Sequence, residues 1–192
     1  MLMKIIVVTI LTSFLLSFNN KTIGDSTKWI NNFKEFRNAV YKKDKAKVKK
    51  FINFPVLSSG NQIWYLAYNG NEKALNLLND KTKPFTEKDF YLYFDKIFSK
   101  LFINAILKIK TNELNNKGET ESIELNDGKA TTYKMIATFE KSTYSLSLNL
   151  ASNTIEKDTN GEILDGGEFN IIYQFEISST GQLKIKQVEL AG

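Results

Sequence analysis

The clearest chemical groups in this sequence are a carboxylate and a phenol one helical turn apart, Asp95 and Tyr91. Asp95 stands among aromatic residues, with Phe94 before it and Phe98 one turn later. A buried aspartate has a raised pKa and can act as a general base, while a tyrosine hydroxyl can stabilise an oxyanion. An aspartate beside Lys96 is more often an exposed residue at the edge of a polar helix face. We therefore assign no catalytic residue, and Asp95 and Tyr91 remain candidates only under an enzyme hypothesis.

Histidine and cysteine are both absent from the sequence. Their absence excludes Ser-His-Asp and Cys-His nucleophiles, zinc sites with nitrogen and sulfur ligands, and disulfide bonds. Any chemistry would have to use carboxylates, tyrosines or lysines. We expect no cofactor.

An oxygen-rich segment, "EKDTNGEILDGGE", is the one stretch that could hold a hard cation such as calcium. Its candidate ligands are Asp158, Asn160, Glu162 and Asp165. The calcium-binding loop of an EF-hand needs glycine at its sixth position, where this chain has Ile163. A polar loop between two strands explains the segment equally well, so no metal site is predicted. No phosphate-binding glycine loop or nucleic-acid module is found either, and nucleic acid is not an expected partner.

Basic residues are concentrated near the N-terminus. Residues 28–50 carry nine basic and two acidic side chains, a net charge of +7, whereas residues 51–192 carry fifteen and eighteen, a net charge of −3. Within the first segment, Lys45, Lys47 and Lys49 alternate with other residues and could contact an anionic surface of the cell envelope. They could equally form the solvated side of a helix. We favour the solvated side, because charged residues on helices are normally exposed to water.

The first nineteen residues have the pattern of a secretory signal. Lys4 precedes fourteen residues, "IIVVTILTSFLLSF", that are apolar except for small hydroxyl side chains. That length suits the hydrophobic region of a signal peptide and is short for a membrane span. We expect a signal peptide over 1–19, a single domain over 20–192, and an exported protein that is periplasmic or secreted. An uncleaved membrane anchor is the alternative, because Ser17, Phe18 and Asn19 match the cleavage rule poorly.

Two helices are expected at the start of the mature chain. The first enters through Ser26 or Thr27, and the second starts near Asp44 and ends before Pro55. Apolar side chains recur at helical spacing in both. These are Trp29, Phe33, Phe36 and Val40 in the first helix, and Val48, Phe51 and Ile52 in the second.

A third, longer helix is predicted over residues 90–107, after a capping box formed by Thr86 and Asp89. It has apolar side chains on two faces, so both must be covered, one by a sheet and the other by the first two helices. The stretch "NQIWYLAYNG" before it is compatible with a strand that ends at Asn69 and Gly70. The following "EKALNLL" predicts a short helical turn.

The C-terminal half predicts an antiparallel sheet. Apolar and polar residues alternate over three stretches, residues 133–139, 144–150 and 169–177. Hairpin turns are expected at 126–128 and 179–181, and the last strand changes phase as if it had a bulge near Lys186 and Gln187. Because helices precede strands, the expected class is α+β, with N-terminal helices packed on a curled antiparallel sheet.

This order of elements resembles a known fold family. Two helices ending in Phe-Pro, the helix "FTEKDFYLYFDKIF" and a sheet ending in "LKIKQVELAG" are similar to exported bacterial proteins of the nuclear transport factor 2-like, cystatin-like class. The resemblance implies a cone-shaped sheet wrapped around the long helix, with a pocket at its open end. Members of the class include ketosteroid isomerase, scytalone dehydratase, and transport and scaffold modules, so fold alone does not assign a function.

Two function classes follow. The first is an exported, noncatalytic binding or interaction module that uses either the pocket, with a small apolar ligand, or the basic end, with an anionic surface. The second is a carboxylate-dependent lyase or isomerase that acts on a small apolar molecule in the pocket. We favour the first, because no second carboxylate can be placed beside Asp95 from the sequence.

Overall fold

The computed structural model describes residues 26–78, 82–157, 159–160, 163–164 and 166–192. The expected signal peptide lies outside these residues, as do three of the candidate calcium ligands, Asp158, Glu162 and Asp165.

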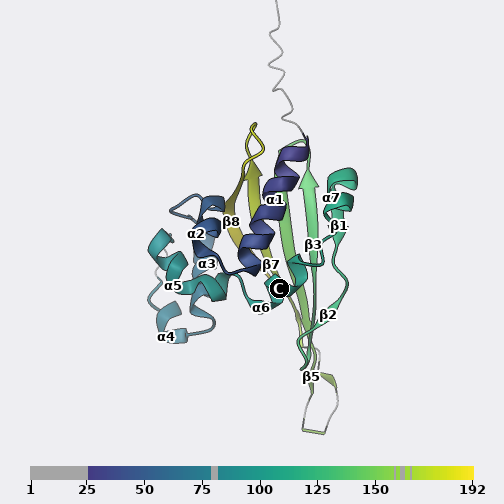
Figure 1. Ribbon diagram of the computed structural model, residues 1–192. Coiled ribbons are helices and arrows are strands. Elements are labelled where there is room, and N and C mark those ends of the chain that lie inside the picture. The colour runs from purple at the N-terminus through teal and green to yellow at the C-terminus, as the bar shows by residue number, and fades with distance from the viewer. Residues whose placement is uncertain (1–25, 79–81, 158, 161–162, 165) are drawn as a thin grey trace, which may run out of the picture.

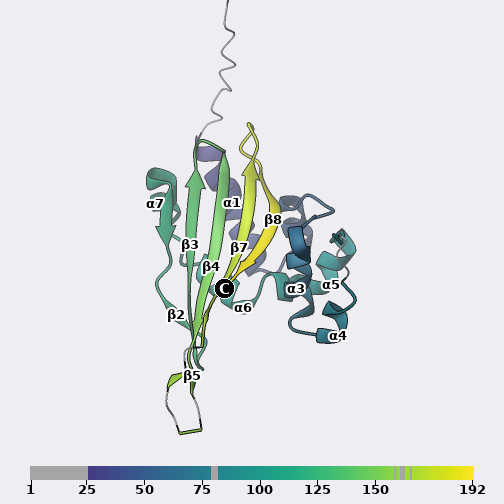
Figure 2. The same cartoon turned by 180° about the vertical axis from the view of Figure 1, so that it is seen from behind.

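A curled, unclosed antiparallel sheet of six strands forms one layer of the fold (Figures 1 and 2). The strand order is β1-β3-β4-β7-β8, and β2 also pairs with β3. A separate two-stranded ladder, β5 and β6, projects from one end of the sheet. The strands are β1 (Glu119–Glu121), β2 (Leu125–Asn126), β3 (Thr131–Glu140), β4 (Ser145–Thr154), β5 (Glu156–Lys157), β6 (Ile163–Leu164), β7 (Glu168–Ile177) and β8 (Leu183–Ala191).

The described α-helices form the second layer and lie on one face of this sheet or beside it, which confirms the α+β class (Figures 1 and 2). We call the helix-covered side the inner face and the opposite side the outer face. The helices are α1 (Ser26–Tyr41), α2 (Lys45–Val48), α3 (Gln62–Tyr68), α4 (Glu72–Leu75), α5 (Glu87–Ile97), α6 (Lys100–Ile106) and α7 (Thr111–Lys117), with 3-10 turns η1 (Lys49–Phe51) and η2 (Ser59–Asn61).

The first N-terminal helix is confirmed, and the second is shorter than predicted, because its α-helix ends at Val48 and Ile52 is extended and forms a β-bridge with Ile185. All four apolar residues of the α1 stripe are buried, and the ring of Phe36 lies edge-on to that of Phe175 on β7, with 5.2 Å between centroids. Asp44 caps α2 by accepting a hydrogen bond from the backbone nitrogen of Lys47. Beyond α2, the chain continues into η1, where Phe51 is buried against Phe36. The predicted stripes therefore attach both helices to the core.

The single long helix expected over 90–107 is wrong, because the chain breaks between α5 and α6. Phe98 leaves helical geometry, with φ −110° and ψ 75°, and the Ser99 side chain caps α6 by accepting from the backbone nitrogen of Phe102. A serine that caps a new helix offers the backbone an alternative to continuing the old one. The hydroxyl of Tyr173 on β7 donates to the carbonyl of Ile97 at 2.5 Å, so a side chain of the sheet supplies a hydrogen bond to a carbonyl at the break.

The strand expected over residues 61–70 is also wrong, since residues 62–68 form α3. Its buried face contains Ile63, Trp64 and Ala67, which is helical spacing. The Trp64 ring packs edge-on against Phe85 and against Tyr93 of α5. Short apolar runs fit a strand or a helix by pattern alone, and here contact with α5 selects the helix. The short turn expected after it is confirmed as α4.

The sheet follows the predicted alternation closely. The β7–β8 register shifts between Gln174 and Phe175, which leaves Lys186 as the extra residue of a bulge, as predicted. The turn at 179–181 joins the same two strands. It needs glycine at its last position, because Gly181 has a φ of +81° and an added Cβ would lie 2.7 Å from the Cβ of Lys28.

Candidate functional site

At the end of the sheet that carries β5, the inner face extends beyond the helices (Figure 1). Alternate residues of β7 point to this face, and their exposure increases along the strand. Tyr173 is 1% exposed, Ile171 is partly buried, and Phe169 is 42% exposed. The apolar inner face therefore opens to solvent at this end, and we call this opening the open-end recess.

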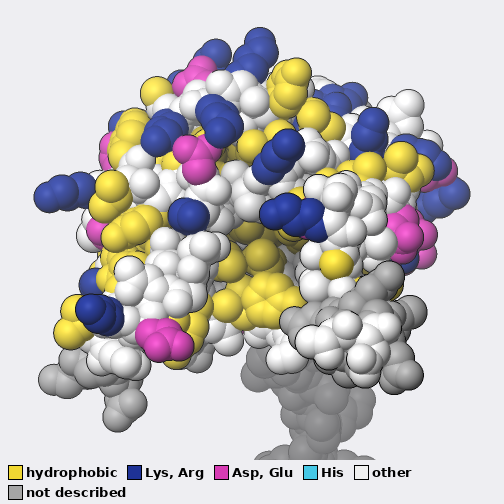
Figure 3. All heavy atoms as spheres, turned by 90° about the horizontal axis from the view of Figure 1, so that it is seen from below, with side chains coloured by type: hydrophobic (Ala, Val, Ile, Leu, Met, Phe, Trp, Pro, Cys, Tyr) yellow, Lys and Arg dark blue, Asp and Glu magenta, His cyan; other side chains and the backbone are white. Residues whose placement is uncertain are grey.

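Figure 3 looks at this end from below and shows hydrophobic side chains gathered in a central hollow. Strand register gives the inner residues that reach it. One inner row near this end consists of Leu125, Tyr133, Ser152 and Phe169, and the next row towards the core consists of Met135, Leu150, Ile171 and Leu190. The first of these rows combines two aromatic rings with one aliphatic and one hydroxyl side chain, which suits a small, mostly apolar molecule.

The polar side chains of the inner sheet face at this end are neutral. Asn104 of α6 donates to the Tyr133 hydroxyl at 3.3 Å, and Ser152 donates to the carbonyl of Phe169 at 2.9 Å. None of the inward-facing positions of β3, β4, β7 and β8 carries a charged side chain. Deeper on the same face, burial raises the pKa of Tyr173 far above its usual value, which keeps its hydroxyl protonated. These strands can therefore position a ligand but supply no general base.

The candidate catalytic pair lies elsewhere, on the exposed surface of α5. The Asp95 side chain is 60% exposed and forms an ion pair with Lys43, with 2.5 Å between Oδ1 and Nζ. Tyr91 is also exposed, and its backbone carbonyl accepts a hydrogen bond from Lys45. The apolar surroundings that an enzyme would need around Asp95 are thus not found at this position.

The three lysines considered for anion binding contact other parts of this chain. Lys45 Nζ donates to the Tyr91 carbonyl at 2.8 Å and lies over the Phe94 ring. Lys47 pairs with Asp44 at 3.2 Å. Lys49 pairs with Glu87 at 2.8 Å, and hydrogen bonding to this carboxylate raises the pKa of Lys49. Lys45 of α2 and Lys49 of η1 therefore both contact α5.

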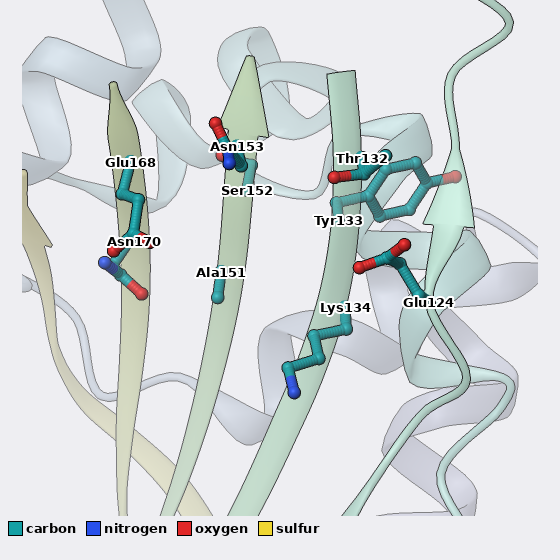
Figure 4. A pocket seen from close by; sticks show the side chains of 9 residues that line it. All are labelled: Glu124, Thr132, Tyr133, Lys134, Ala151, Ser152, Asn153, Glu168 and Asn170. Carbon is teal, nitrogen blue, oxygen red and sulfur yellow. The ribbon is translucent and has the colours of Figure 1, made fainter. Parts of the chain in front are cut away.

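A second depression lies on the outer face, and sequence analysis did not anticipate it (Figure 4). It has a volume of about 340 Å³ and side chains from β3, β4 and β7 around it. Lys134 lines it and pairs with Glu121 at 2.8 Å, and this contact raises the pKa of Lys134. The lining residues are Glu124, Thr132, Tyr133, Lys134, Ala151, Ser152, Asn153, Glu168 and Asn170. The polar residues that alternate along these strands predict an outward-facing side of the sheet. Any solvated sheet face has the same pattern, so it does not predict a depression.

Neither a metal site nor a membrane span is found among the described residues. They contain no group of three acidic side chains placed to hold a metal ion. No helix within them is long and apolar enough to cross a membrane.

Comparisons with models of protein families, with curated protein sequences and with solved structures found no match to this chain, so its function has to be inferred from its own geometry.

Proposed function

We propose that this protein is a noncatalytic binding module that holds a small apolar molecule in the open-end recess. The observation that carries the proposal is the inner sheet face, which is apolar, uncharged along its four long strands and open to solvent at Phe169 beyond the helices. Apolar surface that is left open in a concave place is typical of ligand sites, and a few neutral hydrogen-bonding groups can orient the ligand. Asn104, Tyr133 and Ser152 are such groups here.

The enzyme hypothesis receives less support. General acid–base catalysis needs a titratable group within hydrogen-bonding reach of the substrate. The inward-facing positions of the four long strands carry no carboxylate or lysine, and Asp95 lies on the exposed side of α5, paired with Lys43. The anionic-surface hypothesis is also weaker, because Lys45, Lys47 and Lys49 would have to give up existing contacts.

The fold assignment to the nuclear transport factor 2-like cone is part of the same proposal. A curled sheet, helices on its inner face and a hollow at one end support it (Figures 1 and 3). In such a cone the pocket lies at the open end, which is where Phe169 becomes exposed.

Replacing Phe169 with aspartate tests the recess. Nile red, an uncharged apolar dye, should bind the wild-type protein saturably, and Phe169→Asp should weaken that binding about tenfold or more, because a buried aromatic contact contributes roughly 1.5–3 kcal/mol. The matched control is Ile172→Asp, on the same strand but facing outward. Fluorescence titration of folded samples measures both. An equal loss in the two variants, or no saturable binding to the wild type, contradicts the proposed site.

We also propose that the protein is exported. The support is the basic residue followed by an apolar stretch at the start of the sequence. Expression of the full chain in a bacterial host should give material outside the cytoplasm whose N-terminus, read by mass spectrometry, begins within a few residues of Asn19. An intact N-terminus on membrane-bound protein would favour the anchor instead.

A further inference from the structure

The outer face of the sheet is not covered by any helix among the described residues (Figure 2). Antiparallel sheets often expose one face to water, so an open face alone does not indicate a partner. What separates this face from an ordinary solvated one is the way its charges are arranged.

The centre of the outer face is uncharged and built mainly of small side chains. Its middle strand, β4, presents Ser145, Ser147, Asn149 and Ala151, all partly buried. Asn149 lies in one row with Ile136 and Ile172 on the neighbouring strands. The side-chain oxygen of Asn149 is buried and has no hydrogen-bond partner. A centre of this kind can be desolvated at a lower cost than a charged one, because it holds no charge.

The charged residues of this face are mostly acidic. Strand register places six glutamates but only two lysines at outward positions of β1, β3, β4, β7 and β8, and the exposed bulge residue Lys186 adds a third lysine, so the net charge is −3. The glutamates are Glu119, Glu121, Glu140, Glu168, Glu176 and Glu189, and the lysines are Lys134, Lys184 and Lys186. The whole chain is basic, with 26 basic and 21 acidic residues. The acidic excess is therefore local to this face.

The opposite side of the molecule carries the opposite charge. Helix α1 buries Trp29, Phe33 and Phe36 against the core, so its exposed residues, among them Lys28, point away from the sheet. Lys42 is exposed directly after the helix. Residues 28–50 have a net charge of +7 from nine basic and two acidic side chains, and the charge is +5 when Asp95 and Glu87, the ion-pair partners of Lys43 and Lys49, are included. In Figure 3, lysine and arginine side chains gather in the upper half of the view, which is the helix side. We call the exposed surface of α1 and α2 the basic surface; a groove on it is lined in part by Lys34 and Lys42.

We propose that the outer face binds the basic surface of a second copy of this chain. Charge complementarity favours this front-to-back contact, because it brings a surface of net negative charge onto one of net positive charge. A symmetric contact of two outer faces would instead bring together two sets of six glutamates, which repel. A front-to-back contact leaves one acidic face and one basic surface free at the ends of each assembly. Association should therefore continue beyond a dimer as the protein concentration rises.

Paired charge reversals test the contact. Glu168→Lys with Glu189→Lys changes the outer face, and Lys34→Glu with Lys42→Glu changes the basic surface. All four side chains are at least partly exposed, and none of them is an ion-pair partner in the described structure. Each double variant alone should associate at least about tenfold more weakly than wild type. A mixture of the two should regain association, because each supplies the charge that the other has lost. Glu72→Lys, on the exposed part of α4, is the control for the single variant Glu168→Lys, because both raise the net charge by two and Glu72→Lys should leave association unchanged.

Sedimentation velocity of the purified protein over a concentration series measures the association. Wild type should form oligomers larger than a dimer at about 0.05 M salt and lose most of that association at about 0.3 M, as screened charge contacts do. A protein that stays monomeric at low salt overturns the proposal, and the acidic face would then be open to a basic partner of another sequence. A discrete dimer, or association that survives both reversals, also overturns it.

Discussion

Replacing Phe36 with alanine should lower the free energy of unfolding by about 3–5 kcal/mol, the range for removing a buried aromatic side chain. Phe36 is completely buried, and its ring contacts those of Phe51, Phe98 and Phe175 at centroid distances of 5.4, 5.8 and 5.2 Å. These three partners come from η1, the end of α5 and β7, so one side chain joins both N-terminal helices to the sheet. Urea unfolding followed by circular dichroism measures the loss.

Tyr41→Ala is the matched control for this change. Tyr41 lies at the end of the same helix and is 57% exposed, so its removal should change the free energy of unfolding by no more than about 0.5 kcal/mol. Similar losses in the two variants would show that α1 contributes through its helix propensity rather than through the Phe36 contacts. Since a domain of this size has a total stability of about 5–15 kcal/mol, the difference is easily measured.

The elements that sequence analysis predicted correctly are those with several repeats of one period. The α1 stripe spans three helical turns, and each long strand has four or five inward positions, which leaves few competing interpretations. The two errors occur where the pattern is ambiguous. Residues 62–68 are too short to separate a strand from a helix, and the break at Phe98 depends on Ser99 and on the Tyr173 hydroxyl. The latter comes from a strand 76 positions away.

The candidate sites were less predictable than the fold, for a related reason. The alternation of β7 indicates that Phe169 and Ile172 face opposite sides, but not where the helices stop or that the outer face stays uncovered. The lysines illustrate the same limit. Lys49 pairs with Glu87 and Lys43 with Asp95, at separations of 38 and 52 residues. No local pattern reveals such partners, so the sequence could not decide which lysines were available to a ligand.

The stability of this protein should fall steeply in alkali because of one buried hydroxyl. Tyr173 is packed between the rings of Phe98 and Phe102, and this burial raises its pKa well above the usual tyrosine value. In the unfolded chain the hydroxyl ionises near pH 10. The stabilisation from a raised pKa is fully present below the unfolded pKa and is lost as the pH rises towards the folded one. Above about pH 10, the free energy of unfolding should therefore decrease by about 1.4 kcal/mol per pH unit from this group.

Tyr173→Phe isolates that contribution. At pH 7 the variant should be less stable by about 0.5–1.5 kcal/mol, because the hydrogen bond to the Ile97 carbonyl is lost. Above pH 10 the wild type alone carries the tyrosine penalty, so the two stabilities should converge within about one pH unit and then reverse in order. Urea unfolding from pH 7 to 12 measures both curves, and Tyr41→Phe, at an exposed position, should stay parallel to wild type throughout. If the unfolding free energies of Tyr173→Phe and wild type also remain parallel above pH 10, the Tyr173 hydroxyl ionises in the folded protein at its ordinary pKa. That result would contradict the burial of this hydroxyl at the Ile97 carbonyl.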